Sequence, residues 1–251
     1  MIMNKNSFMS VMTQRFVFLI FLLGKIFRFI TFGAFLLFLL KGTGGLGGYN
    51  INQVLFFYLT FIFVDSLAQV FFREVYRFRP LVISGDLDLI LVKPINVLVR
   101  VLFGGTDFID LASLPVILFF LIKTGQILNP NLFQVILFVL LMVNGLVIAM
   151  AFHIAVISFG IITLEIDHTI LIYRDLLTFA RFPIDIYKEP LKSILTYIIP
   201  VGVMITMPAK ALMGIISPSG VVGSFLFGGL FLFLSLRFWN FALTKYTSAS
   251  S

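Results

Sequence analysis

The chain has 251 residues, with 18 lysines and arginines against 11 acidic residues, and 60% of it is hydrophobic. Only 12% is charged, about half of what soluble globular domains carry. This composition excludes an ordinary soluble enzyme, and it excludes a disordered chain, which would be polar and highly charged. The basic residues are scattered between apolar runs, so we expect no nucleic-acid partner. Lysines and arginines gathered at the cytoplasmic ends of membrane spans explain the positive surplus instead.

Long apolar segments determine the predicted architecture, because a spanning helix needs ~20 mostly apolar residues. We expect residues 1–21 to form a helix on the cytoplasmic membrane surface and residues 247–251 to form a frayed tail. Five spans are predicted within residues 16–40, 51–72, 101–122, 132–160 and 221–243.

Residues 161–214 allow two arrangements that give the same number of spans. In the first, residues 162–182 are a short fifth span, followed by a re-entrant hairpin at 190–214. In the second, residues 161–189 are a cytoplasmic loop and 191–213 are the fifth span.

Different residues of this region favour different arrangements. Pro200 and Pro208 interrupt the later apolar stretch, which favours the re-entrant hairpin. Arg174, Asp175 and Arg181 favour the loop, because charges are costly inside a bilayer. Either way, the sequence predicts an all-α membrane protein with six transmembrane helices.

The orientation follows from the loop at 73–100, which holds five of the 18 basic residues. The two nearest loops on the opposite side hold one each, Lys41 and Lys123. The positive-inside rule therefore places the loop and both termini in the cytoplasm, with the chain in a plasma or inner membrane. We expect residues 1–251 to form a single transmembrane domain surrounded by membrane lipid.

Three polar residues stand out inside the predicted spans. Asp65 and Gln69 are four residues apart on one helix face, and His153 lies well inside the fourth span. An acid inside a span costs ~2.5–3.5 kcal/mol on insertion scales, so it usually faces a bundle interior or water. These residues are candidates for lining a pathway, and structural hydrogen bonds are the alternative interpretation.

A stripe of small residues in the last span indicates close helix packing. Gly220, Ser224 and Gly228 recur every four residues, which lets two backbones approach closely. The partner helix belongs either to the same chain or to a second copy in a dimer.

No motif for nucleotide or metal chemistry is found. Residues 42–47 match G-x-G-x-x-G, but they link two membrane helices and lack the βαβ setting that dinucleotide binding needs. No phosphate-binding loop occurs, so any ATP would be hydrolysed by another chain. Cysteine is absent, and the spacing of Glu165, Asp167 and His168 matches no helix-borne ligand pair, so we expect no metal site.

The most informative segment is residues 84–94, whose pattern predicts a turn and then a short helix that ends before a proline. Asp86 is the expected N-cap. Leu87, Ile90 and Leu91 share one face, which either rests on the membrane or is presented to the groove of a soluble partner. The residues expected to dock that partner are Gly85, Asp86, Leu87, Asp88, Ile90, Leu91, Lys93 and Pro94.

Residues 83–94 resemble the "I-x-S-G-E-L-D-L-L-L-x-[RK]-P" segment of type-2 ATP-binding-cassette (ABC) exporter permeases, with Asp86 in place of glutamate. The compact six-span family of that class is the closest in pattern. Its other motifs follow in order: Gly-Gly-Tyr at 47–49, a segment similar to "A-R-Y-P-x-x-I-Y" at 180–187, and the Ile-Pro, Met-Pro-Ala and Leu-Met-Gly groups between 199 and 214. The resemblance covers residues 20–243.

This resemblance implies a permease subunit of an ATP-driven exporter for an apolar, amphipathic or lipid-like substrate. Two ABC ATPase subunits would dock at residues 73–100 and would hold the ATP and Mg²⁺, so that this chain needs no cofactor and is no enzyme. A second copy or a sister permease would complete the membrane core, and residues 190–214 would be an outer re-entrant hairpin. The alternative is a proton-coupled secondary transporter that uses Asp65 and His153.

Overall fold

The computed structural model describes residues 15–163 and 166–247, and it is an all-helical bundle over those residues. Most of the expected surface helix, residues 1–14, and the tail at 248–251 lie outside the described residues. Residues 15–21 belong to the same continuous helix as the first predicted span.

Five helices are long and apolar enough to cross a membrane. They confirm the five spans that the sequence predicts outside residues 161–214. The third of these helices begins at Phe108, later than the start of the predicted apolar stretch at residue 101. The Asp107 carboxylate accepts hydrogen bonds from the backbone N–H groups of Ile109 and Asp110 and thereby caps the helix there. The five are α2 (Arg15–Thr43), α3 (Ile51–Phe72), α7 (Phe108–Ile127), α8 (Leu132–Thr163) and α12 (Pro218–Lys245).

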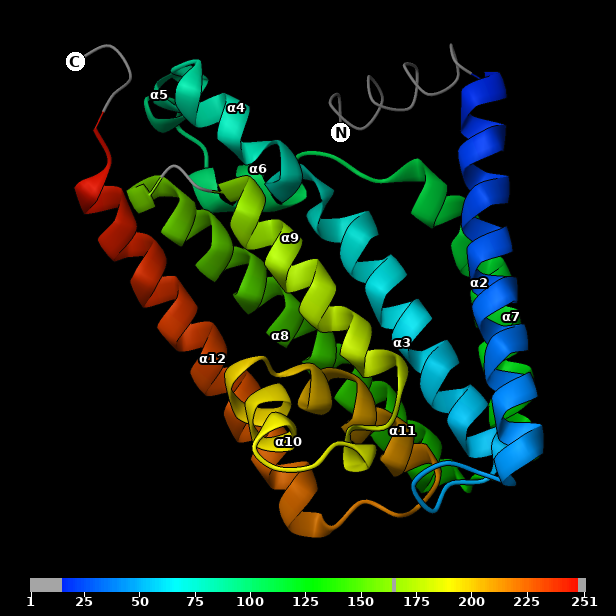
Figure 1. The fold of residues 1–251 in the computed structure, drawn as a ribbon. Coiled ribbons are helices and arrows are strands. Elements are labelled where there is room, and N and C mark those ends of the chain that lie inside the picture. Colours follow the sequence, from blue (N-terminus) through cyan, green and yellow to red (C-terminus); the bar gives the residue numbers. More distant parts are fainter. Residues whose placement is uncertain (1–14, 164–165, 248–251) are drawn as a thin grey trace.

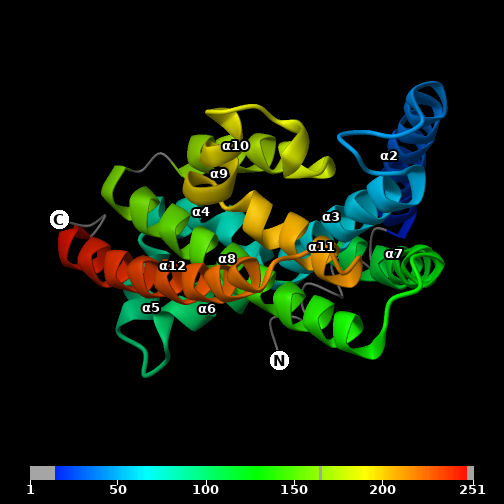
Figure 2. The same ribbon diagram turned by 90° about the horizontal axis from the view of Figure 1, so that it is seen from below.

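The long helices run up and down between two ends of the bundle (Figure 1). We call the end that carries α4, α5 and α6 the loop end. The opposite end carries α10 (Leu191–Ser193) and α11 (Met207–Leu212), and we call it the hairpin end. The start of α2 and the end of α12 both lie toward the loop end. Viewed from below, α2 and α7 lie at one edge of the bundle, and α8 and α12 run beside each other away from that edge (Figure 2).

Short helices make up the loop end. Residues Arg73–Arg77 form a 3-10 turn that continues α3, and three helices follow it before α7. These three are α4 (Phe78–Ile83), α5 (Asp86–Leu91) and α6 (Val97–Phe103).

The ambiguous region forms one helix beside α8 and then a bent pair of helices, and the choice between its two predicted arrangements stays a prediction. Helix α9 (Ile166–Leu177) and a 3-10 turn at Thr178–Arg181 return beside α8 from the loop end toward the hairpin end (Figure 1). The next apolar stretch is no straight span, because Leu191–Ile198 and Gly202–Leu212 meet at an angle of 79°. Up to six spans are counted if this bent pair is taken as one.

Proline explains where the hairpin bends. Ile199, which precedes Pro200, has φ −113° and ψ 88°, outside the helical region. A residue before proline is pushed out of the helical region by the proline ring, so the helix stops there. Pro208 does not break the chain, because it occupies the first turn of α11 (Met207–Leu212), where its missing N–H is tolerated.

The buried core lies around α3 and α8, whereas α2 exposes most of its apolar side chains. Phe38 of α2 is 82% exposed and Phe16 is 76% exposed. Apolar patches of this extent are rare on soluble monomers, and they fit a helix that contacts lipid or another membrane chain.

Candidate functional site

Helix α5 begins at a tight turn in the middle of the loop end. Gly85 adopts the left-handed conformation with φ 77°, and it is the N-cap residue. Asp86 is therefore the first helical residue, and the prediction that it is the N-cap was wrong. Its carboxylate accepts the Ser84 hydroxyl at 2.7 Å, which stabilises the turn before the helix.

The face that α5 turns outward differs from the face predicted. Leu87 is fully buried and Ile90 is 7% exposed, so these two side chains pack against the bundle of this chain. Leu89 and Val92 are 59% and 82% exposed and point away from the core. The period of the helix showed that one face is apolar, but only the packing shows that this face is used internally.

The remaining predicted docking residues surround this outward face. Leu91 and Asp88 are half-buried, and Lys93 and Pro94 are exposed just after the helix. Asp88 lies beside Tyr246, and burial together with this carboxylate raises the pKa of the Tyr246 hydroxyl.

A buried carboxylate connects the 3-10 turn after α3 to the base of the loop. The side chain of Glu74 is only 8% exposed, and it forms ion pairs with Arg100 at 3.3 Å and Arg77 at 3.7 Å. Gly105 packs so closely that a Cβ there would lie 2.5 Å from a Glu74 oxygen. These contacts hold the loop end rigidly on α3.

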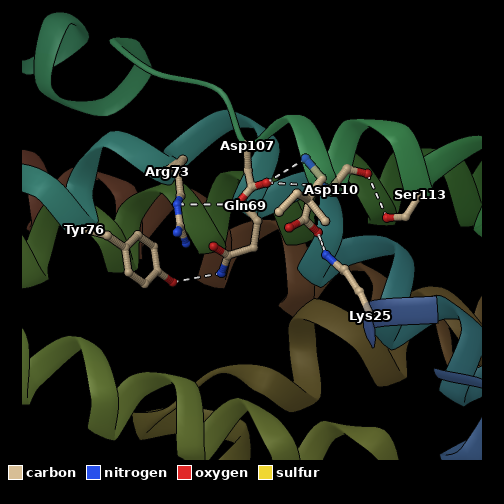
Figure 3. A network of polar contacts seen from close by, with 8 residues as sticks. Lys25, Gln69, Arg73, Tyr76, Asp107, Asp110 and Ser113 are labelled. Carbon is tan, nitrogen blue, oxygen red and sulfur yellow. Dashed lines mark hydrogen bonds and ion pairs between the residues drawn. The ribbon is translucent and has the colours of Figure 1, made fainter. Parts of the chain in front are cut away.

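Further polar contacts join α2, α3 and α7 just below the loop end (Figure 3). Lys25 of α2 forms an ion pair with Asp110 of α7. Arg73 lies 3.4 Å from Asp107. Gln69, a predicted pathway residue, donates instead to the Tyr76 hydroxyl at 2.9 Å and is buried.

Asp65 lines a cavity between α2, α3 and the turn after α9, with a volume of about 50 Å³. Two arginines, Arg28 and Arg181, line the same cavity. The rest of the wall is largely aromatic and includes Tyr58, whose hydroxyl donates to the Phe29 carbonyl at 3.1 Å. Sequence reasoning singled out Asp65 and did not foresee the two arginines beside it.

His153 does not line this cavity. Its Nδ1 donates to the Ala149 carbonyl at 2.7 Å, and its ring centroid lies 5.1 Å from that of Phe72 and 5.3 Å from that of Tyr173. Its Nε2 meets no hydrogen-bond partner among the described residues. Asp65 and His153 therefore have different surroundings.

The small-residue stripe lies partly against α8 of the same chain. Asn144 of α8 donates to the Ser224 carbonyl at 2.9 Å, and a Cβ at Gly228 would lie 2.2 Å from the Asn144 side-chain oxygen. Gly220, at the hairpin end of α12, accepts the Ser224 hydroxyl at 2.6 Å.

A cluster that the sequence did not indicate closes the hairpin end. Asp185 accepts the Tyr49 hydroxyl at 2.7 Å and forms ion pairs with Lys210 at 2.6 Å and Lys192 at 3.3 Å. We call these four residues the Asp185 latch. Burial by itself would raise the pKa of the Asp185 carboxyl, but the hydrogen bonds from Lys210, Tyr49 and Lys192 hold that pKa below its usual value.

The latch joins three segments that are far apart in the chain. Tyr49 comes from the glycine-rich turn after α2, and Gly47 of the same turn would place a Cβ 2.7 Å from Ile186. The two lysines come from the two arms of the bent hairpin. No local pattern could have shown this, because Tyr49 and Asp185 are 136 residues apart.

The polar clusters of the described residues contain no group that could hold a metal ion. No group of three or more histidine and acidic residues gathers within the ranges 15–163 and 166–247. Glu165 lies outside the described residues, and His168 is exposed.

The loop, the bent hairpin and the membrane helices agree with one family of transporters. Comparisons with curated proteins and with solved structures gave no match. A family model described as ABC-2 family transporter protein matches residues 25–250. This match runs from α2 through the loop end and the hairpin end to the end of α12, so the chain belongs to the ABC-2 family of transporter membrane proteins.

Proposed function

We propose that the chain is the permease subunit of an ATP-driven exporter that moves an apolar, amphipathic or lipid-like substrate outward. Its membership of the ABC-2 family supports the transport role and implies a partner ATPase. Two such ATPase subunits would supply the energy and would hold ATP and Mg²⁺. A second copy or a sister permease would pack beside this chain to complete the membrane core.

The observation that carries the proposal is the outward face of α5. Leu89 and Val92 are exposed apolar side chains flanked by the charged Asp86 and Lys93. A short helix with apolar anchors and a charged rim fits a groove on a partner protein. Leu87 anchors the same helix in the core, so movement of a bound ATPase would be transmitted to α3.

The distribution of charge supports a cytoplasmic position for the loop end. Arg73, Arg77, Arg79, Lys93 and Arg100 all belong to this end. Positive residues near membrane spans collect on the cytoplasmic side. We therefore place both termini and α5 in the cytoplasm and the Asp185 latch on the outer side of a plasma or inner membrane.

The test is affinity purification of the tagged chain in mild detergent, followed by mass spectrometry. An ATPase with a phosphate-binding loop is expected in the eluate, and Val92→Asp is expected to remove it. The matched control is Ile215→Asp, which places the same charge at a residue 49% exposed at the hairpin end and is expected to keep the ATPase.

Two results with the variants would contradict docking at the outward face of α5. One is retention of the ATPase by Val92→Asp, and the other is its loss with Ile215→Asp. If no ATPase is recovered and transport in vesicles follows a pH gradient, the proton-coupled alternative replaces the proposal.

A further inference from the structure

Two cavities adjoin between the membrane helices, and they differ sharply in chemistry. The cavity at Asp65 is small and charged. Beside it, a groove of about 400 Å³ lies between α2, α3 and α7 and is almost wholly apolar. Phe29, Tyr58 and Ile62 line both, so the two cavities are direct neighbours that share these side chains. A volume of this size is in the range of small-molecule sites, about 300–1,000 Å³.

The charged cavity carries an excess of positive charge. Arg28, which is exposed on its outer side, and Arg181, which is partly exposed, line it together with a single carboxylate, Asp65. Neither guanidinium forms an ion pair or a hydrogen bond within the described residues. At least one net positive charge therefore remains, whichever protonation state Asp65 adopts.

Other nearby charges do not remove this excess. Lys25 and Asp110 are already paired with each other. Arg174 adds further positive charge, and its guanidinium lies 5.9 Å from the centre of the Tyr76 ring. A charge within a span is costly unless it is paired or faces water or a ligand. Arg181 is the least exposed of these arginines, so its charge favours a negatively charged ligand in the cavity.

The aromatic rings of the cavity argue against a cationic ligand. The guanidinium of Arg181 lies 5.0 Å from the centre of the Phe32 ring and 5.8 Å from that of Phe61. Arg28 lies 5.5 Å from the centre of the Phe29 ring. The ring faces that could hold the ammonium group of a ligand are thus already covered by the guanidinium groups of Arg28 and Arg181.

We propose that the two cavities together bind an amphipathic anion. Its carboxylate, phosphate or sulfate head lies between Arg28 and Arg181, and its apolar tail lies along the groove between α2, α3 and α7. Arginine suits such a head because its fork of N–H donors matches two oxygens. This inference rests on the proposed function and specifies the substrate class of the exporter.

The test uses the purified chain in nanodiscs of zwitterionic lipid and a long-chain fatty acid with a photoreactive group on its chain. Cross-links mapped by mass spectrometry are expected on the groove residues of α2, α3 and α7. The unlabelled fatty acid is expected to compete at least ~10-fold better than the alcohol of equal length, since hydrogen bonds to charged groups are the strong ones. The alkyltrimethylammonium of that length is expected not to compete.

Substitutions localise the binding of the head group. Arg181→Gln and Arg28→Gln are each expected to weaken labelling ~10- to 100-fold. Arg237→Gln is the matched control, because Arg237 also lies over a phenylalanine ring, at 5.3 Å, but on exposed α12. It is expected to change labelling by less than about 2-fold, within the ordinary effect of a surface substitution.

Three results would overturn the inference: equal competition by the ammonium compound, an equal effect of Arg237→Gln and Arg181→Gln, or cross-links confined to α12. The comparison of head groups uses the unaltered chain, so it decides the question even if a variant does not fold. The assay contains no ATPase, so its outcome is independent of docking at α5.

Discussion

The Asp185 latch gives the sharpest prediction about stability. In Asp185→Asn the side chain keeps its shape and one acceptor oxygen but loses its charge. The Lys210 ammonium, 2.6 Å away on a side chain 18% exposed, then has no anionic partner in the latch. Because two separate segments are held by this carboxylate, the hairpin should open more readily while the rest of the bundle stays folded.

The expected cost follows from the contacts. A hydrogen bond to a charged group contributes ~1.5–3 kcal/mol, and the bond from Tyr49 can persist as a neutral one of ~0.5–1.5 kcal/mol. Lys192 is 40% exposed, so its pair with Asp185 contributes under ~1 kcal/mol. We expect a net loss of about 2–3 kcal/mol for opening of the hairpin.

Hydrogen–deuterium exchange of the chain in nanodiscs measures this opening. Amides in residues 191–212 should exchange roughly 30-fold faster or more in Asp185→Asn, since 1.4 kcal/mol corresponds to a factor of ten. The control is Glu189→Gln. Glu189 is a nearby exposed residue whose carboxylate accepts hydrogen bonds from the backbone N–H and the hydroxyl of Ser193 in the same turn. Equal exchange in the two variants would refute the latch.

The latch also predicts a dependence on pH. The folded state lowers the pKa of Asp185, so the stabilisation is fully present above the unfolded pKa of about 3.9 and is lost as pH falls through the folded pKa. Protection of the hairpin should therefore decrease below about pH 4 in the unaltered chain. In Asp185→Asn this part of the pH dependence should be absent.

Three further predictions concern the packing of the bundle. Gly228→Ala should destabilise the α8–α12 contact by ~1–3 kcal/mol, and Gly229→Ala, with open space around it, should change stability by less than ~0.5 kcal/mol in thermal unfolding. Lys25→Met should cost ~3–5 kcal/mol because it leaves a buried carboxylate unpaired, and adding Asp110→Leu should restore much of the loss in the same measurement. Leu87→Asp should abolish the folded monodisperse peak in size-exclusion chromatography, because this side chain is fully buried; a normal peak would show that α5 does not pack as described.

The membrane spans could be predicted from the sequence because lipid imposes a local rule. A spanning segment must be apolar over ~20 residues and must satisfy its own backbone, so each of the five spans outside residues 161–214 is readable without its neighbours. Helix α3 occupies the predicted residues 51–72, and α8 begins at the predicted Leu132. The family resemblance at residues 83–94 was readable for a similar reason, because its residues are contiguous.

The tertiary structure decided which residues meet. It turned Leu87 inward and Val92 outward, since helical periodicity identifies an apolar face but not what that face packs against. It brought Arg28, Asp65 and Arg181 to one cavity, and it joined Tyr49 to Asp185 across the chain. Such contacts depend on the packing of distant helices, whose relative placement is set by side-chain complementarity and not by the hydropathy of any single segment.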